Sequence, residues 1–214
     1  MRASPLPDLS EEHALRAVGH ARVAGLDEAG RGAWAGPVCA AAAVLPLDQD
    51  DLMSVLDGVR DSKLLTPRRR EALLPIIREV SLAVGVGWGA PAEIDVWGIV
   101  PATRLAMGRA VAALEDRVDA LLVDYLRLPG LDVPQRSLPK ADALCLSVAA
   151  ASIIAKVERD RLMIALEEEY PGYGFAQHKG YGTAQHRAAL ARLGPSPIHR
   201  VSWRPMREGW DDEQ

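Results

Sequence analysis

Apolar runs bounded by turn-forming residues predict four strands in the first two thirds of the chain. Residues 23–26 and 37–45 are almost wholly apolar and flank a short glycine-rich stretch, a pattern typical of two buried strands. Because so few residues separate them, we expect these strands to be antiparallel neighbours. Two further runs, 82–86 and 120–123, predict strands of the same kind, and the second ends on Asp124.

Helical patterns account for much of the remaining chain. Thr66 as a capping residue and Pro67 at the first helical position predict a helix that is kinked or ended early at Pro75. The other predicted helices span residues 10–18 (capped by Ser10), 91–97, 101–114, 143–168 and 183–194 (capped by Thr183). The segment 128–139, with three prolines, is predicted to be a loop. This mixture of strands and helices predicts an α/β fold with a central mixed sheet.

The candidate chemistry begins where the first predicted strand ends. Asp27 and Glu28 are followed by Gly30, Arg31 and Gly32, so that two carboxylates stand beside a cation on a glycine-flanked turn. Carboxylates are hard ligands for Mg²⁺ or Mn²⁺, glycines let a ligand approach the backbone, and arginine offers phosphate a planar fork of donors. The segment therefore suits metal-assisted chemistry on a phosphodiester, although an ordinary polar turn has the same composition.

Two more acids extend this site. Asp124 ends a predicted strand and Asp142 precedes the longest predicted helix, so both could meet Asp27 and Glu28 at one edge of the sheet. Two carboxylates 4 Å apart repel by about 1 kcal/mol in water and about 4 kcal/mol at an effective dielectric of 20. Bound cations or protonation must relieve that repulsion, and paired divalent ions do so in phosphodiester hydrolysis. Taken alone, Asp142 could equally be a helix cap, and Asp124 could merely end a strand.

The charge distribution is more informative than the net charge. The 214 residues fit one domain, and their formal net charge of −4 carries no global nucleic-acid signature. Between Tyr170 and Arg207, however, there is no Asp or Glu. The cations of that stretch are Lys179, Arg187, Arg192, Arg200, Arg204 and Arg207. They could steer a polyanion to one face, and a solvated surface is the alternative.

The remaining composition favours a cytoplasmic protein. Cys39 and Cys145 lie in apolar surroundings and are expected to be buried free thiols. No apolar stretch is long enough to span a bilayer, and the start of the chain does not have the pattern of a secretory leader. The acidic tail, residues 210–214, is expected to be disordered and is assigned no function.

Ordered sequence blocks along almost the whole chain resemble the bacterial ribonuclease HII family. The blocks are residues 25–32, 36–38, 61–63, 149–156, 170–174, 178–183 and 194–200, with Asp124 and Asp142 between them. The resemblance implies a ribonuclease H-like fold, with a catalytic domain over residues 1–168. A helical substrate-binding extension, residues 169–214, would pack on this domain as part of one structural unit. It also implies endonucleolytic cleavage of RNA in RNA–DNA hybrids and on the 5′ side of ribonucleotides embedded in duplex DNA. The products would carry a 5′-phosphate and a 3′-hydroxyl.

The resemblance also assigns roles to individual residues. Asp27, Glu28, Asp124 and Asp142 would be the catalytic, metal-binding acids of a two-metal site for Mg²⁺ or Mn²⁺. Gly30, Arg31 and Gly32 would read the ribose 2′-hydroxyl, largely through the backbone, and Tyr181 would pack on the sugar at the RNA–DNA junction. Lys63, Lys179 and Arg200 are candidate phosphate contacts.

The chain departs from the family pattern around the third and fourth acids and leaves other functions open. Tyr125 follows the third acid where the family often has glycine, and Leu144 stands near the fourth acid where it often has lysine. A hybrid-binding protein that has lost catalysis is one alternative. Another is a related nuclease such as a junction resolvase, which would need no 2′-hydroxyl. We expect a monomer with no membrane partner.

Overall fold

The computed structural model describes residues 6–115 and 117–209, with a five-stranded sheet at its centre. The strands are β1 Val23–Ala29, β2 Val38–Val44, β3 Ala83–Gly89, β4 Ala120–Asp124 and β5 Gln135–Leu138, in the spatial order β3-β2-β1-β4-β5. Strand β1 is antiparallel to β2 and parallel to β4. The predicted antiparallel pair and the predicted mixed sheet of an α/β fold are therefore confirmed.

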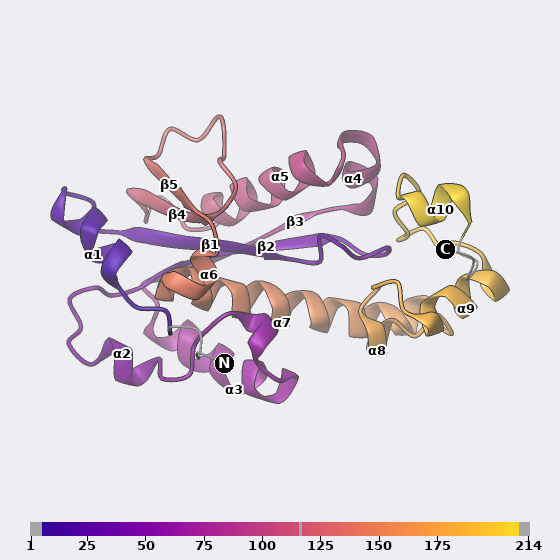
Figure 1. The fold of residues 1–214 in the computed structure, drawn as a ribbon, viewed down its shortest axis with the longest axis horizontal. Coiled ribbons are helices and arrows are strands. Elements are labelled where there is room, and N and C mark those ends of the chain that lie inside the picture. Colours follow the sequence, from indigo (N-terminus) through magenta and orange to yellow (C-terminus); the bar gives the residue numbers. More distant parts are fainter. Residues whose placement is uncertain (1–5, 116, 210–214) are drawn as a thin grey trace.

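Helices cover both faces of this sheet (Figure 1). They are α1 Ser10–Ala17, α2 Leu52–Val55, α3 Pro67–Val80, α4 Pro91–Trp97, α5 Ile99–Ala112, α6 Ala141–Leu144, α7 Leu146–Glu169, α8 Phe175–His178, α9 Ala184–Leu193 and α10 Arg204–Glu208, with a 3₁₀ turn, η1, at Ser62–Leu64. Helices α3 and α7 lie on one side and α5 on the other, while α8, α9 and α10 lie at one end. The long helix α7 runs from the sheet to that end.

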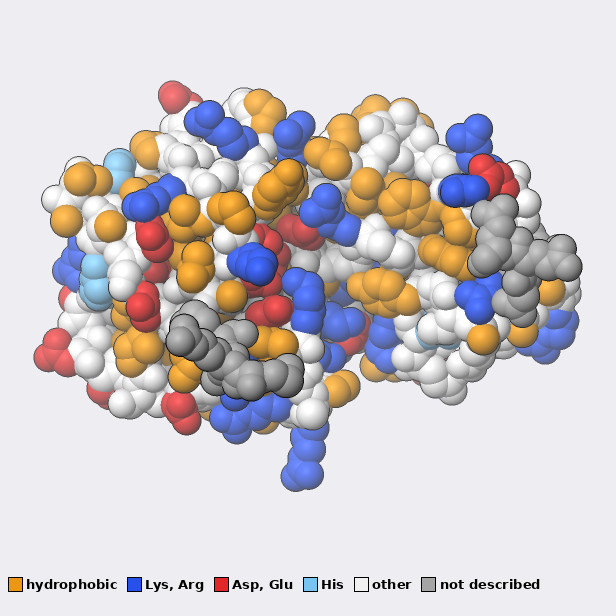
Figure 2. Space-filling view, in the orientation of Figure 1, with side chains coloured by type: hydrophobic (Ala, Val, Ile, Leu, Met, Phe, Trp, Pro, Cys, Tyr) orange, Lys and Arg blue, Asp and Glu red, His pale blue; other side chains and the backbone are white. Residues whose placement is uncertain are grey.

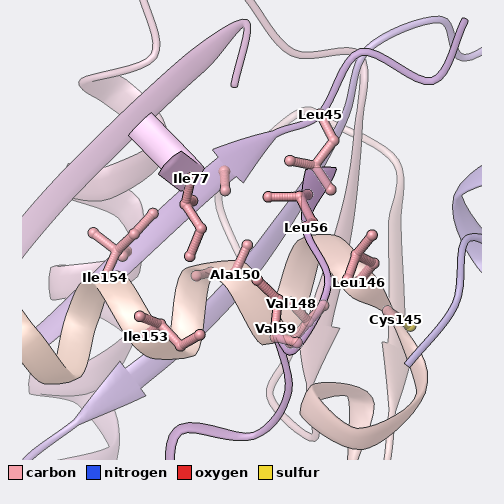
Figure 3. Close-up of a cluster of buried hydrophobic side chains, with 14 of the residues drawn as sticks. Leu45, Leu56, Val59, Ile77, Cys145, Leu146, Val148, Ala150, Ile153 and Ile154 are labelled. Atoms are coloured by element: carbon pink, nitrogen blue, oxygen red, sulfur yellow. The ribbon is translucent and has the colours of Figure 1, made fainter. Parts of the chain in front are cut away.

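Small residues let the helices lie close to the sheet. A Cβ atom added at Gly85 would lie 1.9 Å from the carbonyl oxygen of Ala110 in α5. One added at Gly25 would lie 2.2 Å from the backbone of Ser147 at the start of α7. Figure 3 shows Leu45, Leu56 and Ile77 gathered with Ile153 and Ile154 of α7 in the cluster on that face. Glycine in β1 thus fixes the approach of α7 beside the strand that carries the first two acids.

Two details of the secondary-structure prediction are wrong, and of the kink or early end predicted at Pro75 the early end does not occur. The predicted loop 128–139 contains β5, a parallel edge strand flanked by Pro134 and Pro139, and an edge strand tolerates proline at its ends. The single helix predicted over 143–168 is two, because Cys145 has extended backbone between α6 and α7. Helix α3 continues past Pro75, which is exposed, so that the carbonyl group left without a partner faces water.

Two helix caps are confirmed and one is wrong. The hydroxyls of Thr66 and Thr183 accept hydrogen bonds from the N–H groups of Arg69 (3.3 Å) and His186 (3.2 Å). Ser10 does not cap α1; its own N–H donates to the Asp8 carboxylate at 2.8 Å. As predicted, both cysteines are buried free thiols. Of the helices in the described residues, none has the length and apolarity needed to cross a membrane. The acidic tail, 210–214, lies outside those residues.

Candidate active site

The register of β1 and β4 brings two of the predicted acids together. Leu26 pairs with Val123 in this parallel ladder, so Asp27 and Asp124 are the next residues along the two strands. Val23 and Leu122 both contribute to the core cluster under α7, and alternation along each strand places Asp27 and Asp124 on that same face. Neighbouring strands are about 4.8 Å apart, so the two carboxylates lie side by side at the sheet edge.

Asp142 reaches this edge from the first turn of α6. The Asp124 Oδ1 atom accepts a hydrogen bond from the N–H of Ala141 at 2.9 Å, which ties the end of β4 to the start of α6. Lys63 of η1 points into the same place, with its ammonium 3.2 Å from Asp142 Oδ2 and 3.7 Å from Asp61 Oδ1. Segments far apart in sequence therefore converge, as predicted from the strand ends.

Glu28 lies on the opposite face of β1 but belongs to the same cluster. Its Oε1 atom accepts a hydrogen bond from Arg31 Nη1 at 3.0 Å. Its Oε2 atom is buried and has no hydrogen-bond partner among the residues that the structure describes. A buried carboxylate oxygen without a partner is unfavourable, and a cation would satisfy it.

Burial and mutual repulsion disfavour the ionised acids. Burial, followed by the charge of Glu28, raises the pKa of Asp27 well above its usual value. Burial also raises the pKa of Glu28, where the charge of Arg31 opposes the rise. It raises the pKa of Asp142 in the same way, and there the charge of Lys63 opposes the rise. Burial lowers the pKa of Lys63, but Asp27, Asp142 and Asp61 outweigh it and the net shift is upward. The cluster thus favours bound positive charge.

Two of the four acids, Asp124 and Asp142, border an open cleft. A cavity of about 670 Å³ is lined by Leu6, Pro7, Arg60, Asp61, Lys63, Leu64, Asp124, Lys140, Asp142 and Ala143. Figure 2 shows acidic side chains near the middle of this face, with Lys and Arg side chains around them. As the side chains stand, no three His, Cys, Asp or Glu residues within 6–115 and 117–209 form a ready metal cage. The donor set nevertheless fits hard divalent ions, because it consists of carboxylate oxygens and includes the unpartnered Glu28 Oε2.

The two glycines of the Gly-Arg-Gly segment serve different purposes. Gly30 has φ +91°, and a Cβ atom there would lie 1.8 Å from Nε of Arg159, so the fold itself requires glycine. Gly32 is exposed and outside the left-handed region, and a Cβ atom there would meet nothing within 4 Å. The fold gives no reason for glycine at position 32, and close approach of an external ligand would be one.

Tyr181 lies beside residues 33–35, which follow the Gly-Arg-Gly segment. The carbonyl group of its neighbour Gly180 accepts hydrogen bonds from the N–H groups of Trp34 and Ala35, at 2.8 and 3.2 Å. The half-buried Tyr181 ring has Lys156 Nζ 5.5 Å and Arg159 Cζ 5.4 Å from its centroid. The ring therefore stands next to the loop that carries the two glycines.

Two of the predicted phosphate contacts, Arg200 and Lys179, differ in how accessible they are. Arg200 is fully buried, and its guanidinium donates to the carbonyl oxygens of Gly30 (2.7 Å), Arg31 (2.8 Å) and Gly36 (3.0 Å). The prediction that Arg200 contacts phosphate is wrong, because no phosphate can reach it. Lys179 is half-buried, and its ammonium donates to the Ala176 carbonyl oxygen.

A second arginine, Arg159, is fully buried and was not predicted as part of the site. Arg159 of α7 donates to the carbonyl oxygens of Pro37 (2.9 Å), Ala35 (3.1 Å) and Lys179 (2.9 Å). Its spacing was informative, since Ala155 and Met163, one turn away on either side, lie on the buried face of the same helix. A cation on that face needs buried acceptors, and here backbone carbonyl groups supply them.

Comparisons with known proteins agree on one family. A family model described as Ribonuclease HII matches residues 24–206. The chain is 55% identical over 203 residues to a ribonuclease HII of Chloroflexus aurantiacus, covering 95% of this chain and 96% of that protein. It is 50% identical over 212 residues to one from Dehalococcoides mccartyi, covering 99% of both.

Two solved structures have the same fold. The ribonuclease H2 of Pyrococcus horikoshii superposes with a TM-score of 0.67 at 30% identity, covering 87% of this chain and 96% of that one. The ribonuclease HII of Archaeoglobus fulgidus, solved in complex with PCNA, gives 0.71 at 28% identity, covering 90% and 98%. The chain therefore resembles these proteins both in sequence and in fold.

Proposed function

Because the chain belongs to the ribonuclease HII family, we propose that Asp27, Glu28, Asp124 and Asp142 are its catalytic acids. The chain is an endoribonuclease that hydrolyses the RNA strand of RNA–DNA hybrids, and its family is metal-dependent. The observation that carries the assignment is the β1–β4 register, which sets Asp27 beside Asp124 with Asp142 joined to the same strand end.

The acids would hold two divalent ions, Mg²⁺ or Mn²⁺. When bound, such ions stabilise negative charge on the attacking and leaving oxygens of a phosphodiester. Asp27, the most buried of the four, anchors the centre of the site, while Glu28 offers its unpartnered Oε2 atom. Lys63 neutralises Asp142 in the free protein and would move toward a substrate phosphate as cations enter.

Substrate selection would fall to the backbone around Arg31. The open space at Gly32 would let a ribose approach the chain, and Tyr181 would pack against the sugar at the junction. Phosphate contacts by Lys63 and Lys179 would position the duplex without reading its sequence. The proposed specificity is thus for ribose, including a single ribonucleotide cut on its 5′ side within duplex DNA. We further propose that the chain acts as a cytoplasmic monomer, in keeping with its free buried thiols.

The test uses a labelled DNA duplex with one ribonucleotide, with all-DNA and RNA–DNA duplexes as controls. Metal-dependent cutting 5′ of the ribonucleotide, absent in EDTA and on all-DNA, is the expected result. Asp27→Asn should lower turnover at least about 10³-fold, because an amide cannot supply the anionic oxygen, while hybrid binding is largely kept. Full activity of this variant would refute the assigned role. Cutting of all-DNA branches would instead indicate a junction resolvase.

A further inference from the structure

Arg200 binds the Gly-Arg-Gly segment, residues 30–32, from the buried side of the loop. Its two Nη atoms bond the carbonyl oxygens of Gly30 and Arg31, and its Nε bonds that of Gly36. The side chain is fully buried, and no carboxylate lies within ion-pair distance of it in the described residues. All of its side-chain hydrogen bonds therefore go to backbone carbonyl groups, and its Cζ atom lies 5.6 Å from the centroid of the Trp203 ring.

Because a peptide unit is planar, fixing the direction of its carbonyl group also fixes the direction of its N–H group. The carbonyl of Gly30 shares a peptide unit with the N–H of Arg31, and the carbonyl of Arg31 shares one with the N–H of Gly32. No cis peptide bond occurs in the described residues, so each N–H points away from its carbonyl and hence away from Arg200. Neither N–H donates to an acceptor that the structure describes. Two free donors therefore face outward at the exposed Gly32.

The same contact strengthens those donors. A guanidinium at 2.7–2.8 Å from a carbonyl oxygen polarises the peptide unit and makes its N–H a better donor. Burial lowers the pKa of Arg200 only to about 9, so the group stays charged at neutral pH. The low-dielectric surroundings increase the effect.

We propose that Arg200 is a positioning residue for ribose recognition: it orients and polarises the amide donors of Arg31 and Gly32, which bind the 2′-hydroxyl of the substrate. This inference rests on the proposed function, which supplies the ribose. Arg200 itself touches no substrate and acts only through the two peptide units. A lysine could not bond both carbonyl groups in the same planar geometry.

Arg159 provides a matched control. It is as buried as Arg200, carries no ion pair in the described residues, and also bonds three carbonyl groups, including that of Ala35. The N–H that shares the Ala35 peptide unit is that of Gly36, and it donates internally to Ile198 at 2.8 Å. Arg159 therefore stabilises the same loop but presents no outward donor through this unit.

The experiment measures binding in Ca²⁺, without turnover, to a DNA duplex with one ribonucleotide and to the same duplex without it. The ribose preference is the dissociation constant for the all-DNA duplex divided by that for the ribonucleotide duplex. This ratio should fall about tenfold in Arg200→Lys, as expected for about one lost hydrogen bond. Affinity for the all-DNA duplex should stay within twofold. Arg159→Lys should lower Tm and change the ratio much less than Arg200→Lys does, since Arg159 contacts the Tyr181 ring but holds neither of the two peptide units. An unchanged ratio in folded Arg200→Lys overturns the proposal, whereas a wild-type chain without ribose preference overturns the proposed function instead.

A measurement on the wild-type chain keeps the test independent of whether the variants fold. In ¹⁵N-resolved NMR spectra, the amide resonances of Arg31 and Gly32 should shift on adding the ribonucleotide duplex and not the all-DNA duplex. Couplings across the hydrogen bonds from Arg200 to the Gly30 and Arg31 carbonyl carbons should be present in both complexes. Amide resonances that respond equally to both duplexes, or missing couplings, would overturn the inference.

Discussion

Alanine at each glycine of the Gly-Arg-Gly segment should separate a requirement of the fold from a requirement of the substrate. In Gly30→Ala, the new methyl group meets Arg159 Nε at 1.8 Å, and φ is +91°. The left-handed backbone costs about 1–2 kcal/mol, and overpacking adds about 1–3 kcal/mol. We therefore expect a loss of about 2–5 kcal/mol in the free energy of unfolding.

Gly32→Ala should behave in the opposite way. The methyl group meets no atom within 4 Å and φ is outside the left-handed region, so stability should stay the same or rise by about 0.4–1 kcal/mol. If a ribose must approach this backbone, the methyl group stands between the two. Loss of one or two hydrogen bonds in the transition state, about 1.5–3 kcal/mol, would then lower kcat/KM about 10- to 150-fold.

Urea unfolding and single-turnover cleavage of the ribonucleotide duplex measure the two effects on the same preparations. The expected pattern is a destabilised Gly30→Ala and a stable but slow Gly32→Ala. A stable Gly32→Ala enzyme with wild-type kcat/KM would refute the reasoning, because the open space at Gly32 would then serve no ligand. The Gly30→Ala variant controls for indirect damage, since its losses should appear first in stability.

Two further predictions concern stability. Tyr125 has φ +59° and is largely exposed, so Tyr125→Gly should raise the free energy of unfolding by about 0.5–1 kcal/mol. Val18→Gly, at an exposed position with φ −99°, should lower it. Equal urea midpoints for the two variants would contradict this reasoning. Burial lowers the pKa values of His186 and His199 to about 4 from 6.5, so at these two groups the unfolded chain binds more protons between pH 6.5 and 4. The raised pKa values of Asp27 and Glu28 act in the opposite direction, so the histidine contribution is isolated by comparison with a His186→Gln, His199→Gln variant. As pH drops across that window, the Tm of the wild-type chain should fall relative to that of the variant; equal slopes would be the contrary result.

Local signals in the sequence were sufficient to predict the elements that carry the acids. The apolar runs before Asp27 and Asp124 fixed two strands, and strand ends gather at one edge whatever the rest of the fold does. The caps at Thr66 and Thr183 are equally local. The tight turn after Asp124 explains why glycine is common there in the family, since Tyr125 has to adopt a left-handed backbone.

Tertiary burial was the part that could not be predicted. Arg200 belongs to a stretch without acids, and a charge pattern cannot distinguish a cation on the surface from one buried against carbonyl groups. Strand β5 is short and polar, and it forms only because β4 offers a parallel edge. Both errors concern residues whose conformation depends on partners distant in sequence.

The loop before β2 shows why the C-terminal segment belongs to the active site. Every carbonyl group from residue 30 to 37, except that of Gly32, accepts a hydrogen bond from Arg159, Arg200 or Trp203. Several of these groups are buried, and each would cost about 1–3 kcal/mol if left without a donor. Without residues 169–209 the loop would lose most of these donors and could not keep its shape. We therefore propose that 1–168 and 169–214 form one structural unit, in which the C-terminal segment holds the backbone that reads the ribose.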